Sequence, residues 1–208
     1  MLLKAASHPL VDISGISLEF LTSLVTPETG LVHQLLPILQ GRAITPHQFN
    51  GNIPSLLVPK TSESEVMADF LEFEVFRATV LTDCLVACYK AEKASYMSSC
   101  TAAIEEFCGN SGPQVSFHLE AVLFCIGAVS EEVMAEFDAS TSIQLQKCIA
   151  ALASKPQSLM ANPLTLSQSC RFIKKVRDVS WKVGVLSSLS HIFLQPFVRY
   201  NKIDHNEV

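Results

Sequence analysis

Apolar stripes with helical spacing follow one another through residues 66–176, and this feature limits the fold more than any other. Apolar side chains recur every three or four residues from Val66 to Cys88, after a hydroxyl-rich and acidic stretch at 61–65. Hydroxyl groups and acids suit the start of a helix, and the spacing places one apolar face along it. We therefore expect a long amphipathic helix that ends near Lys90.

The same spacing predicts further helices, separated by residues that break helical backbone. They are expected from about Lys93 to the Gly109-Asn110-Ser111-Gly112-Pro113 sequence, from about Ser116, over about 142–153, and from Pro163. Proline directly after Asn162 suits the first position of a helix. The helix after Ser116 carries a continuous apolar face made of Leu119, Val122, Leu123, Ile126, Val129 and Val133. The chain is therefore predicted to be all-α.

Three of the predicted helices begin with a similar stripe, near Val66, His118 and Pro163. Their starts are about 52 and 45 residues apart, close to the roughly 40–47-residue period of HEAT and armadillo helix pairs. The pattern predicts an α-solenoid of HEAT/armadillo-like helix pairs. Such an array works through an extended surface that encloses a partner.

The regions outside this array have different patterns. Two short helices are predicted at 16–26 and 31–40, and Pro37 is expected to kink or shorten the second one. We expect residues 1–40 to form short helices or a partial repeat, 41–62 a proline- and glycine-rich loop or linker, 63–176 the HEAT-like repeats, and 177–208 a divergent tail.

The composition favours a protein partner over nucleic acid. Hydrophobic residues make up 49% of the 208-residue chain and charged residues 17%, which indicates helices buried on several sides. The net charge of −5 disfavours nucleic acid, which requires a concentrated basic surface, and it favours a basic protein. The apolar run Ala121–Val129 is far shorter than the roughly 20 residues that span a bilayer. We expect no membrane contact.

The seven cysteines indicate a reducing compartment, because most lie in apolar helical stretches and none forms a C-x-x-C pair. Cys84 and Cys88 lie one helical turn apart, and a metal site is the alternative to buried thiols there. We expect buried thiols and no metal.

Patterns typical of catalysis are weak. Gly109-Asn110-Ser111-Gly112 resembles a serine nucleophile turn, but Pro113 occupies the position of its last glycine and a helix precedes it. His118 has no identifiable nucleophile or orienting acid near it in the sequence. We expect no catalytic residue and no cofactor, with a small helical enzyme as a remote alternative.

The densest charge in the chain is acidic and consists of Glu63, Glu65, Asp69, Glu72 and Glu74. Two interpretations apply to this acidic face. The acids can offset the helix dipole and face solvent, or they can form a docking surface for a basic partner. A smaller basic cluster, Arg171, Lys174, Lys175 and Arg177, suits the end of a helix and does not indicate nucleic-acid binding.

Three segments of the chain carry residue patterns of one protein family. The segment Phe73-Glu74-Val75-Phe76-Arg77-Ala78-Thr79-Val80 resembles the F-x-x-F-R-x-x-V-x-D helix of the importin-β superfamily of nuclear transport receptors, in its transportin-SR branch, and Asp83 follows one position after the aspartate of that pattern. The segment Glu120–Val133, which reads EAVLFCIGAVSEEV, is similar to the branch's E-A-x-L-F-x-I-x-A-I-A-E-x-V helix. Near the N-terminus, Leu18-Glu19-Phe20-Leu21-Thr22 is similar to an L-E-F-L-T helix of the same carriers.

The resemblance implies an armadillo-like HEAT-repeat receptor that carries protein cargo through the nuclear pore under the control of Ran-GTP. Ran and cargo are the implied partners, nucleoporins are further candidates, and the expected location is nucleus and cytoplasm. Because such carriers are several times longer than this chain, a fragment or truncated form is expected. A HEAT-like scaffold without transport activity is the alternative.

Overall fold

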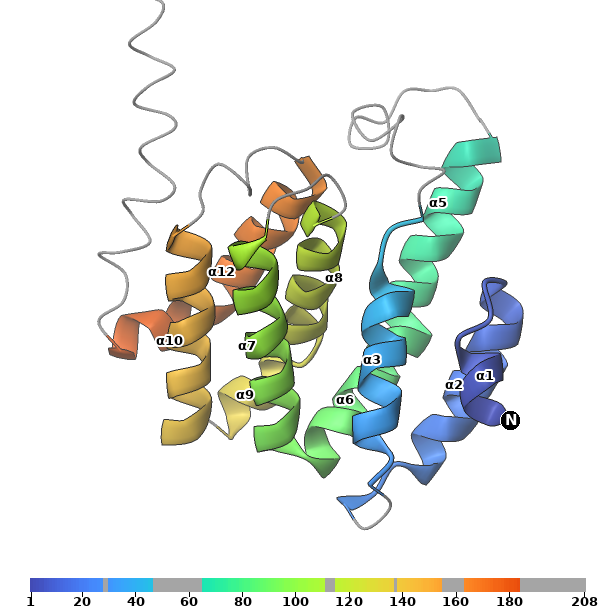
Figure 1. Ribbon diagram of the computed structural model, residues 1–208, viewed down its shortest axis with the longest axis horizontal. Helices are drawn as coiled ribbons and strands as arrows, with labels where there is room; N and C mark the ends of the chain where they lie inside the picture. The colour runs from blue at the N-terminus through green and yellow to red at the C-terminus, as the bar shows by residue number, and fades with distance from the viewer. Residues whose placement is uncertain (28–29, 47–64, 111–114, 137, 155–162, 184–208) are drawn as a thin grey trace, which may run out of the picture.

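The computed structural model describes residues 1–27, 30–46, 65–110, 115–136, 138–154 and 163–183, and every regular element in these ranges is helical. No strand occurs among them. The α-helices are α1 (Leu2–Ala6), α2 (Val11–Leu24), α3 (Val32–Ala43), α5 (Glu65–Phe76), α6 (Thr82–Ala91), α7 (Lys93–Gly109), α8 (Val115–Ala128), α9 (Ser130–Ala135), α10 (Ala139–Ser154) and α12 (Pro163–Val183). A π-helical turn, η3 (Arg77–Leu81), joins α5 to α6 (Figure 1).

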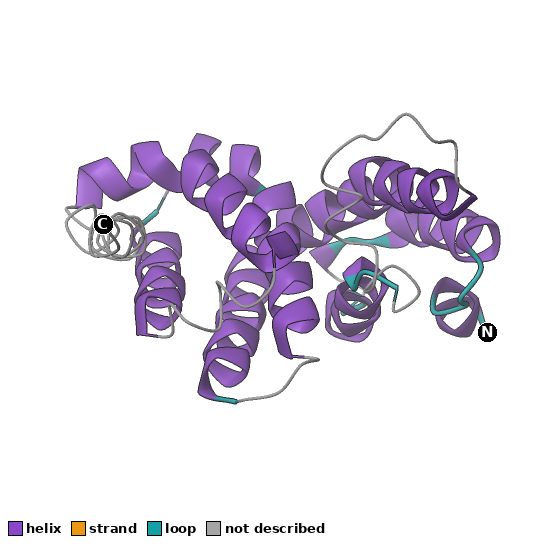
Figure 2. Ribbon diagram, turned by 90° about the horizontal axis from the view of Figure 1, so that it is seen from above, coloured by secondary structure: helices purple, strands orange, loops and turns teal. Residues whose placement is uncertain are grey.

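The helices lie in two rows that run from α1 and α2 at one end to α10 and α12 at the other (Figures 1 and 2). One row contains α3, α7 and α10, and the other contains α5–α6, α8 and α12. Neighbours pack across and along the rows: α7 lies against α8 and α10, and α12 lies against α8. The all-helical class is confirmed.

A single large hydrophobic cluster runs through both rows. Its fully buried members include Leu18, Leu35, Leu85, Tyr96, Leu123, Cys148 and Phe172, which come from seven different helices. Hydrogen bonds join neighbouring helices both across and along the rows. The Tyr96 hydroxyl donates to the Cys125 carbonyl oxygen at 2.8 Å, which joins α7 to α8, and the Thr165 hydroxyl donates to the Ser116 carbonyl oxygen at 2.8 Å, which joins α12 to α8.

The predicted long helix is present as a continuous helical rod from Glu65 to Ala91, but it contains the unpredicted π turn. Most of its predicted inner side chains are buried, namely Phe70, Phe73, Arg77, Cys84 and Cys88, whereas Val80 is half-buried. A π turn holds one residue more than an α turn and leaves a widened backbone. The Thr82 hydroxyl donates to the Arg77 carbonyl oxygen at 2.8 Å, which supplies a local partner within this widened turn.

The effect predicted for Pro37 is wrong as far as helix length is concerned. Helix α3 continues past Pro37 to Ala43, so the predicted loop at 41–62 begins only after Ala43. Proline removes the hydrogen bond to the carbonyl four residues earlier, which here belongs to His33. Both His33 and Pro37 are exposed, so water can satisfy that carbonyl at little cost. Residues 47–62 of the predicted loop lie outside the described residues.

The predicted helix after Ser116 is divided at Val129, although its whole apolar face is buried as expected. The Gly127 carbonyl oxygen accepts two side-chain hydrogen bonds, from the Ser130 hydroxyl at 2.8 Å and from Lys175 Nζ at 2.7 Å. The Ser130 and Lys175 side chains thus occupy the Gly127 carbonyl oxygen, which in a continuous helix would accept from a backbone N–H. The backbone changes direction at Val129, where α9 begins. Lys175 thereby attaches α12 to this break.

The remaining predicted boundaries agree with the structure in part. Helix α12 begins at Pro163 as predicted, and it runs past residue 176 to Val183, into the predicted divergent tail. The Asn162 cap and residues 184–208 lie outside the described residues. Six of the seven cysteines are buried, as expected of core thiols, whereas Cys170 on α12 is exposed.

Truncation of the core in α8 tests this packing. Leu123→Ala removes a side chain that is fully buried between the two rows, and we expect it to lower the free energy of unfolding by about 2–5 kcal/mol. Urea denaturation followed by circular dichroism measures the loss. Ile143→Ala is the matched control on α10, because Ile143 is 51% exposed, and it should change stability by about 0.5 kcal/mol or less. Equal effects of the two substitutions would contradict the described core.

Candidate partner-docking site

The three predicted acids whose side chains the structure describes, Asp69, Glu72 and Glu74, do not lie on one face. Asp69 and Glu72 are exposed on α5, and Glu74 is partly exposed and paired with Arg77 at 3.2 Å. Glu65 begins α5, its side chain lies outside the described residues, and so does Glu63. The structure therefore brings two of the five predicted acids together and separates a third from them.

The separation follows from helix geometry. Each residue turns the helix by about 100°, so Asp69 and Glu72 lie about 60° apart, whereas Glu74 lies about 140° from Asp69. Glu74 consequently points to the opposite flank of α5, toward α8. The prediction of a single acidic face is corrected here to a pair of acids on one flank and an ion-paired acid on the other.

Asp69 and Glu72 line a groove that we call the acidic groove. It has a volume of about 620 Å³ and lies between the α1–α2 connection, the end of α3 and the start of α5. Its charged lining groups are Asp12, Asp69, Glu72 and Arg42, so acids outnumber bases by three to one. Asp12 was not predicted to be part of the site, because it lies nearly sixty residues before Asp69 in the sequence.

Arg42 forms part of the wall of the acidic groove and is half-buried. Its Nη2 atom donates to the Ser14 hydroxyl at 3.1 Å, and its guanidinium lies 5.5 Å from the centre of the Phe76 ring. Burial lowers the pKa of Arg42. Its Nε atom and the hydroxyl of the buried Thr45, which also lines the groove, have no hydrogen-bond partner among the described residues. The wall of the groove therefore contains two hydrogen-bond donors without partners in the described part of the chain, Arg42 Nε and the Thr45 hydroxyl, close to its carboxylates.

On the other flank of α5, a buried ion pair joins the π turn η3 to α8, its neighbour in the same row. Arg77 Nη2 lies 2.8 Å from Glu120 Oε1, and both side chains are only 5% exposed. The Arg77 guanidinium also lies 4.2 Å from the centre of the Phe124 ring and 5.3 Å from that of Phe73. Aromatic faces attract the cation and exclude water from it. Arg77 is therefore held by two carboxylates and two rings.

Burial makes this arrangement sensitive to the loss of either partner. Removal of Glu120 from water raises the pKa of its carboxyl group, and the neighbouring Arg77 opposes that rise. Arg77 Nε and Glu120 Oε2 have no hydrogen-bond partner in the part of the chain that the structure describes. A buried charge that loses its counter-ion costs several kcal/mol, so each residue depends on the other.

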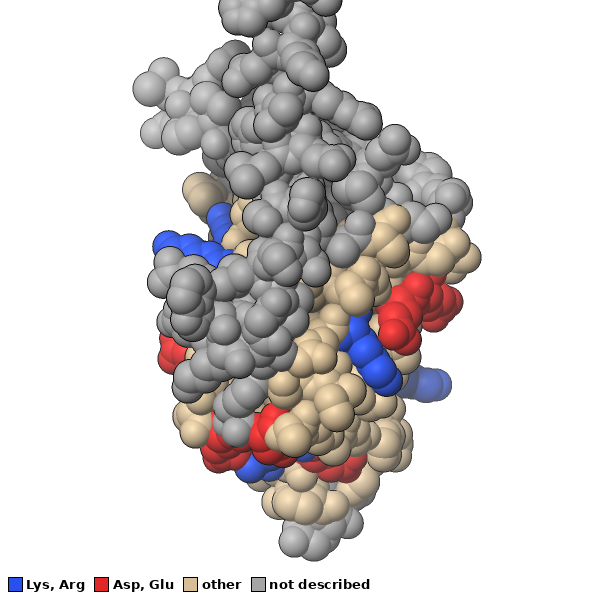
Figure 3. Space-filling model, turned by 90° about the vertical axis from the view of Figure 1, so that its left-hand side faces the viewer, with Lys and Arg blue, Asp and Glu red and all other residues tan. Residues whose placement is uncertain are grey.

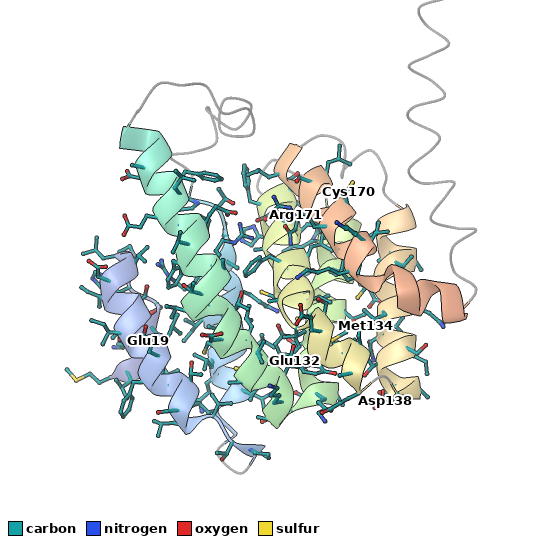
Figure 4. The ribbon with its side chains drawn as sticks, turned by 180° about the vertical axis from the view of Figure 1, so that it is seen from behind. Glu19, Glu132, Met134, Asp138, Cys170 and Arg171 are labelled. Carbon is teal, nitrogen blue, oxygen red and sulfur yellow. The ribbon has the colours of Figure 1, made fainter. Side chains whose placement is uncertain are left out.

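A smaller cleft of about 330 Å³ lies against the ion pair, where α5, α8 and α12 meet. Phe70, Phe124 and Gln168 line it together with Glu74, Glu120, Arg77 and Arg171. Figure 4 shows Arg171 on the part of α12 that lies beside α8, with Cys170 next to it. The opposite charges are balanced in this cleft, so it offers no net attraction to either a cation or an anion.

His118 lines neither of the two hollows. The ring of His118 packs at 5.2 Å from that of Phe107, which agrees with a structural role, and Ser111–Pro113 lie outside the described residues. Within the described ranges, no group of three or more His, Cys, Asp or Glu side chains could hold a metal ion. No helix among those residues combines the length and apolar character needed to cross a bilayer.

The end of the molecule formed by α10 and α12 shows mixed charge. Figure 3 looks onto this end, and its coloured atoms include small groups of basic and acidic side chains without a continuous basic surface. From the predicted basic cluster, Arg171 and Lys174 are exposed, Lys175 bonds to Gly127, and the side chain of Arg177 lies outside the description.

Arg77 and Glu120 were not predicted as site residues, although the sequence contains a signal for them. Each is a charged residue inside an apolar helical stripe, between Phe73 and Val80 in one case and between Leu119 and Val122 in the other. A charge in such a position is rarely buried without an opposite charge beside it. Two such charges of opposite sign on two predicted helices indicate a pair.

Comparisons with protein-family models, curated proteins and solved structures found no match for this chain.

A double-mutant cycle tests the buried pair. Arg77→Met leaves Glu120 buried without its counter-ion and is expected to cost about 3–5 kcal/mol of stability. Glu120→Leu leaves Arg77 with the partly exposed Glu74 as its remaining counter-ion, so its cost should be somewhat smaller. The double substitution should cost less than either single one, because it leaves neither of the two charges without its partner. Chemical denaturation of the four proteins gives the coupling energy.

Lys90→Gln is the control for this cycle. Lys90 and Glu132 form a solvent-exposed ion pair at 3.6 Å, and its loss should change stability by about 1 kcal/mol or less. Additive effects of Arg77→Met and Glu120→Leu would show that the two residues do not depend on each other.

Proposed function

We propose that this chain is a non-catalytic, protein-binding segment of a nuclear transport receptor of the importin-β kind. In this proposal the complete protein carries protein cargo through the nuclear pore, Ran-GTP controls the binding, and the protein moves between nucleus and cytoplasm. Nucleoporins are further partners in the proposal. The chain itself supplies part of the binding surface.

The observation that carries the proposal is the contact between the two segments that resemble these carriers. Arg77 is the arginine of the first segment, Phe73–Val80, and Glu120 is the first residue of the second, Glu120–Val133. They form the buried 2.8 Å ion pair, and Phe73 and Phe124 of the same segments flank it. Residues that belong to one pattern in the sequence thus act together in space, which supports a common origin for both resemblances.

The arrangement of the helices supports an α-solenoid. Helices α5, α8 and α12 correspond to the three similar stripes in the sequence, and they follow one another along the same row. Helices α7 and α10 lie between them in the chain and in the facing row. This alternation is the order that stacked helix pairs produce, and such stacks offer long concave surfaces to folded partners.

The acidic groove is the proposed contact for a basic partner segment. Its three carboxylates, on Asp12, Asp69 and Glu72, exceed the single charge of Arg42 and come from two separate helices. Opposite charge on a partner speeds encounter and fixes its register. The alternative function is a HEAT-like scaffold without transport activity, which the same groove would also serve.

Binding to Ran tests the transport proposal. The complete protein should bind Ran loaded with a non-hydrolysable GTP analogue at least about tenfold more tightly than Ran loaded with GDP, because a carrier must respond to the nucleotide state. Isothermal titration calorimetry measures both affinities. Equal affinity for the two states would contradict control by Ran, and a tagged protein without enrichment at the nuclear envelope would favour the scaffold.

Charge substitutions test the acidic groove independently of Ran. Asp69→Asn combined with Glu72→Gln should weaken the binding of a fluorescent oligolysine peptide by about fivefold or more, and added salt should reduce this difference. Fluorescence anisotropy measures the affinity. Glu105→Gln with Glu106→Gln is the matched control, because these exposed acids on α7 carry the same charge outside the groove. Equal weakening by both pairs would show that net charge, and not the groove, binds the peptide.

A further inference from the structure

Helix α2 directs small polar side chains toward the core and several large apolar side chains toward solvent. Its buried side contains Ser14, Gly15 and Ser17 beside Leu18 and Leu21. The Ser14 and Ser17 hydroxyls donate to the carbonyl oxygens of Val11 and Ile13, at 3.1 Å and 2.9 Å. These hydroxyls are satisfied within the helix, so small polar side chains can face the core. A surface helix ordinarily directs its largest apolar side chains inward.

Four other large apolar side chains of α2 instead point outward. Ile13, Ile16, Phe20 and Leu24 are 41%, 72%, 53% and 42% exposed. At about 100° per residue they fall within an arc of about 80°, and they extend over about 16 Å of the helix. They therefore form one straight apolar stripe, which we call the α2 stripe. A stripe one side chain wide matches the contact row of a single packed helix.

The α2 stripe has an acidic edge. Asp12 and Glu19 are exposed and lie about 40–60° beyond Ile16 on the same side of the helix. They are seven residues apart, so they form a second row parallel to the stripe. Figure 4 shows Glu19 on α2 at the end of the molecule farthest from α12. The exposed face of α2 thus combines an apolar row with a negative row.

We propose that the α2 stripe binds an amphipathic helix of a partner protein, with an apolar row that packs on Ile13, Ile16, Phe20 and Leu24 and a basic row that pairs with Asp12 and Glu19. The surface is separate from the acidic groove except for Asp12, which belongs to both. The proposal does not depend on the proposed transport function.

The charge on the stripe's edge selects this occupant from the others. An anionic membrane surface would be repelled by Asp12 and Glu19, although it would accept the apolar side chains. Two α2 stripes from two copies of this chain would bring the same acids close together if they packed antiparallel, and would leave both acidic rows without an opposite charge if they packed parallel. A helix with lysine or arginine along one edge satisfies both rows at once.

Two synthetic peptides provide the test. The first is a helical peptide of about 18 residues with leucine at every third or fourth position and lysine along one edge, which is long enough to cover the stripe. The second carries glutamate in place of the lysines. Fluorescence anisotropy with the full 208-residue chain measures both affinities. The lysine peptide should bind at least about tenfold more tightly than the glutamate peptide.

Two exposed substitutions separate the contributions of the rows. Phe20→Ser should weaken the lysine peptide about tenfold, while Ile143→Ser, an equally exposed apolar position on α10, should leave it unchanged. Glu19→Lys should weaken the lysine peptide and strengthen the glutamate peptide, a reversal that loss of folding cannot produce. The loss caused by Phe20→Ser should persist when Asp69→Asn and Glu72→Gln are also present, so failure of the groove and failure of the stripe are distinguishable.

Three outcomes would overturn the proposal. Equal binding of both peptides would show that Asp12 and Glu19 do not favour a basic helix over an acidic one. Concentration-dependent dimers that Phe20→Ser abolishes would identify a second copy as the occupant of the stripe. Binding to phosphatidylserine vesicles that Phe20→Ser abolishes would identify a membrane surface.

Discussion

The ion pair between Arg77 and Glu120 is the contact on which the arrangement of the central helices depends. It joins the rod that contains α5 and α6 to α8, and each of its partners is almost fully removed from water. An apolar contact tolerates small shifts, whereas a buried ion pair requires a defined distance and direction. The Phe73 and Phe124 rings restrict the guanidinium further. The angle between the two helices is therefore set by charge as well as by packing.

The π turn lies at the ion pair, because its first residue is Arg77. It begins at Arg77, directly after the last residue of α5, and the Thr82 hydroxyl bonds to the Arg77 carbonyl. An inserted residue changes the direction of all side chains after it by about 100° relative to an uninterrupted helix. The buried face of α6, with Cys84 and Cys88, thus has a different phase from that of α5. The rod thus packs against α2 and α3 through both η3 and α6, and against α8 through α6 and the Arg77 side chain.

Much of the helical order could be predicted from local patterns, because spacing and breakers act over a few residues. The start of α12 at Pro163 and the apolar face of α8 are examples. The acidic groove could not be predicted, because Asp12, Arg42 and Asp69 meet only through tertiary packing. The persistence of α3 beyond Pro37 depends on solvent at His33, which no local rule includes. The pairing of Arg77 with Glu120 was indicated by two charges on apolar stripes, but its partners are 43 residues apart.

The buried thiols give the core a chemical property of its own. Burial raises the pKa of Cys125 to about 12 and that of Cys148 to about 11, and it also raises the pKa of Cys100 well above its ordinary value. Only the thiolate reacts readily with peroxides and alkylating agents, so these side chains are nearly inert at neutral pH. Cys170 is exposed and lacks this protection. Under oxidative stress Cys100, Cys125 and Cys148 would be damaged only in molecules that have already opened, whereas Cys170 is accessible to reagents in the folded protein.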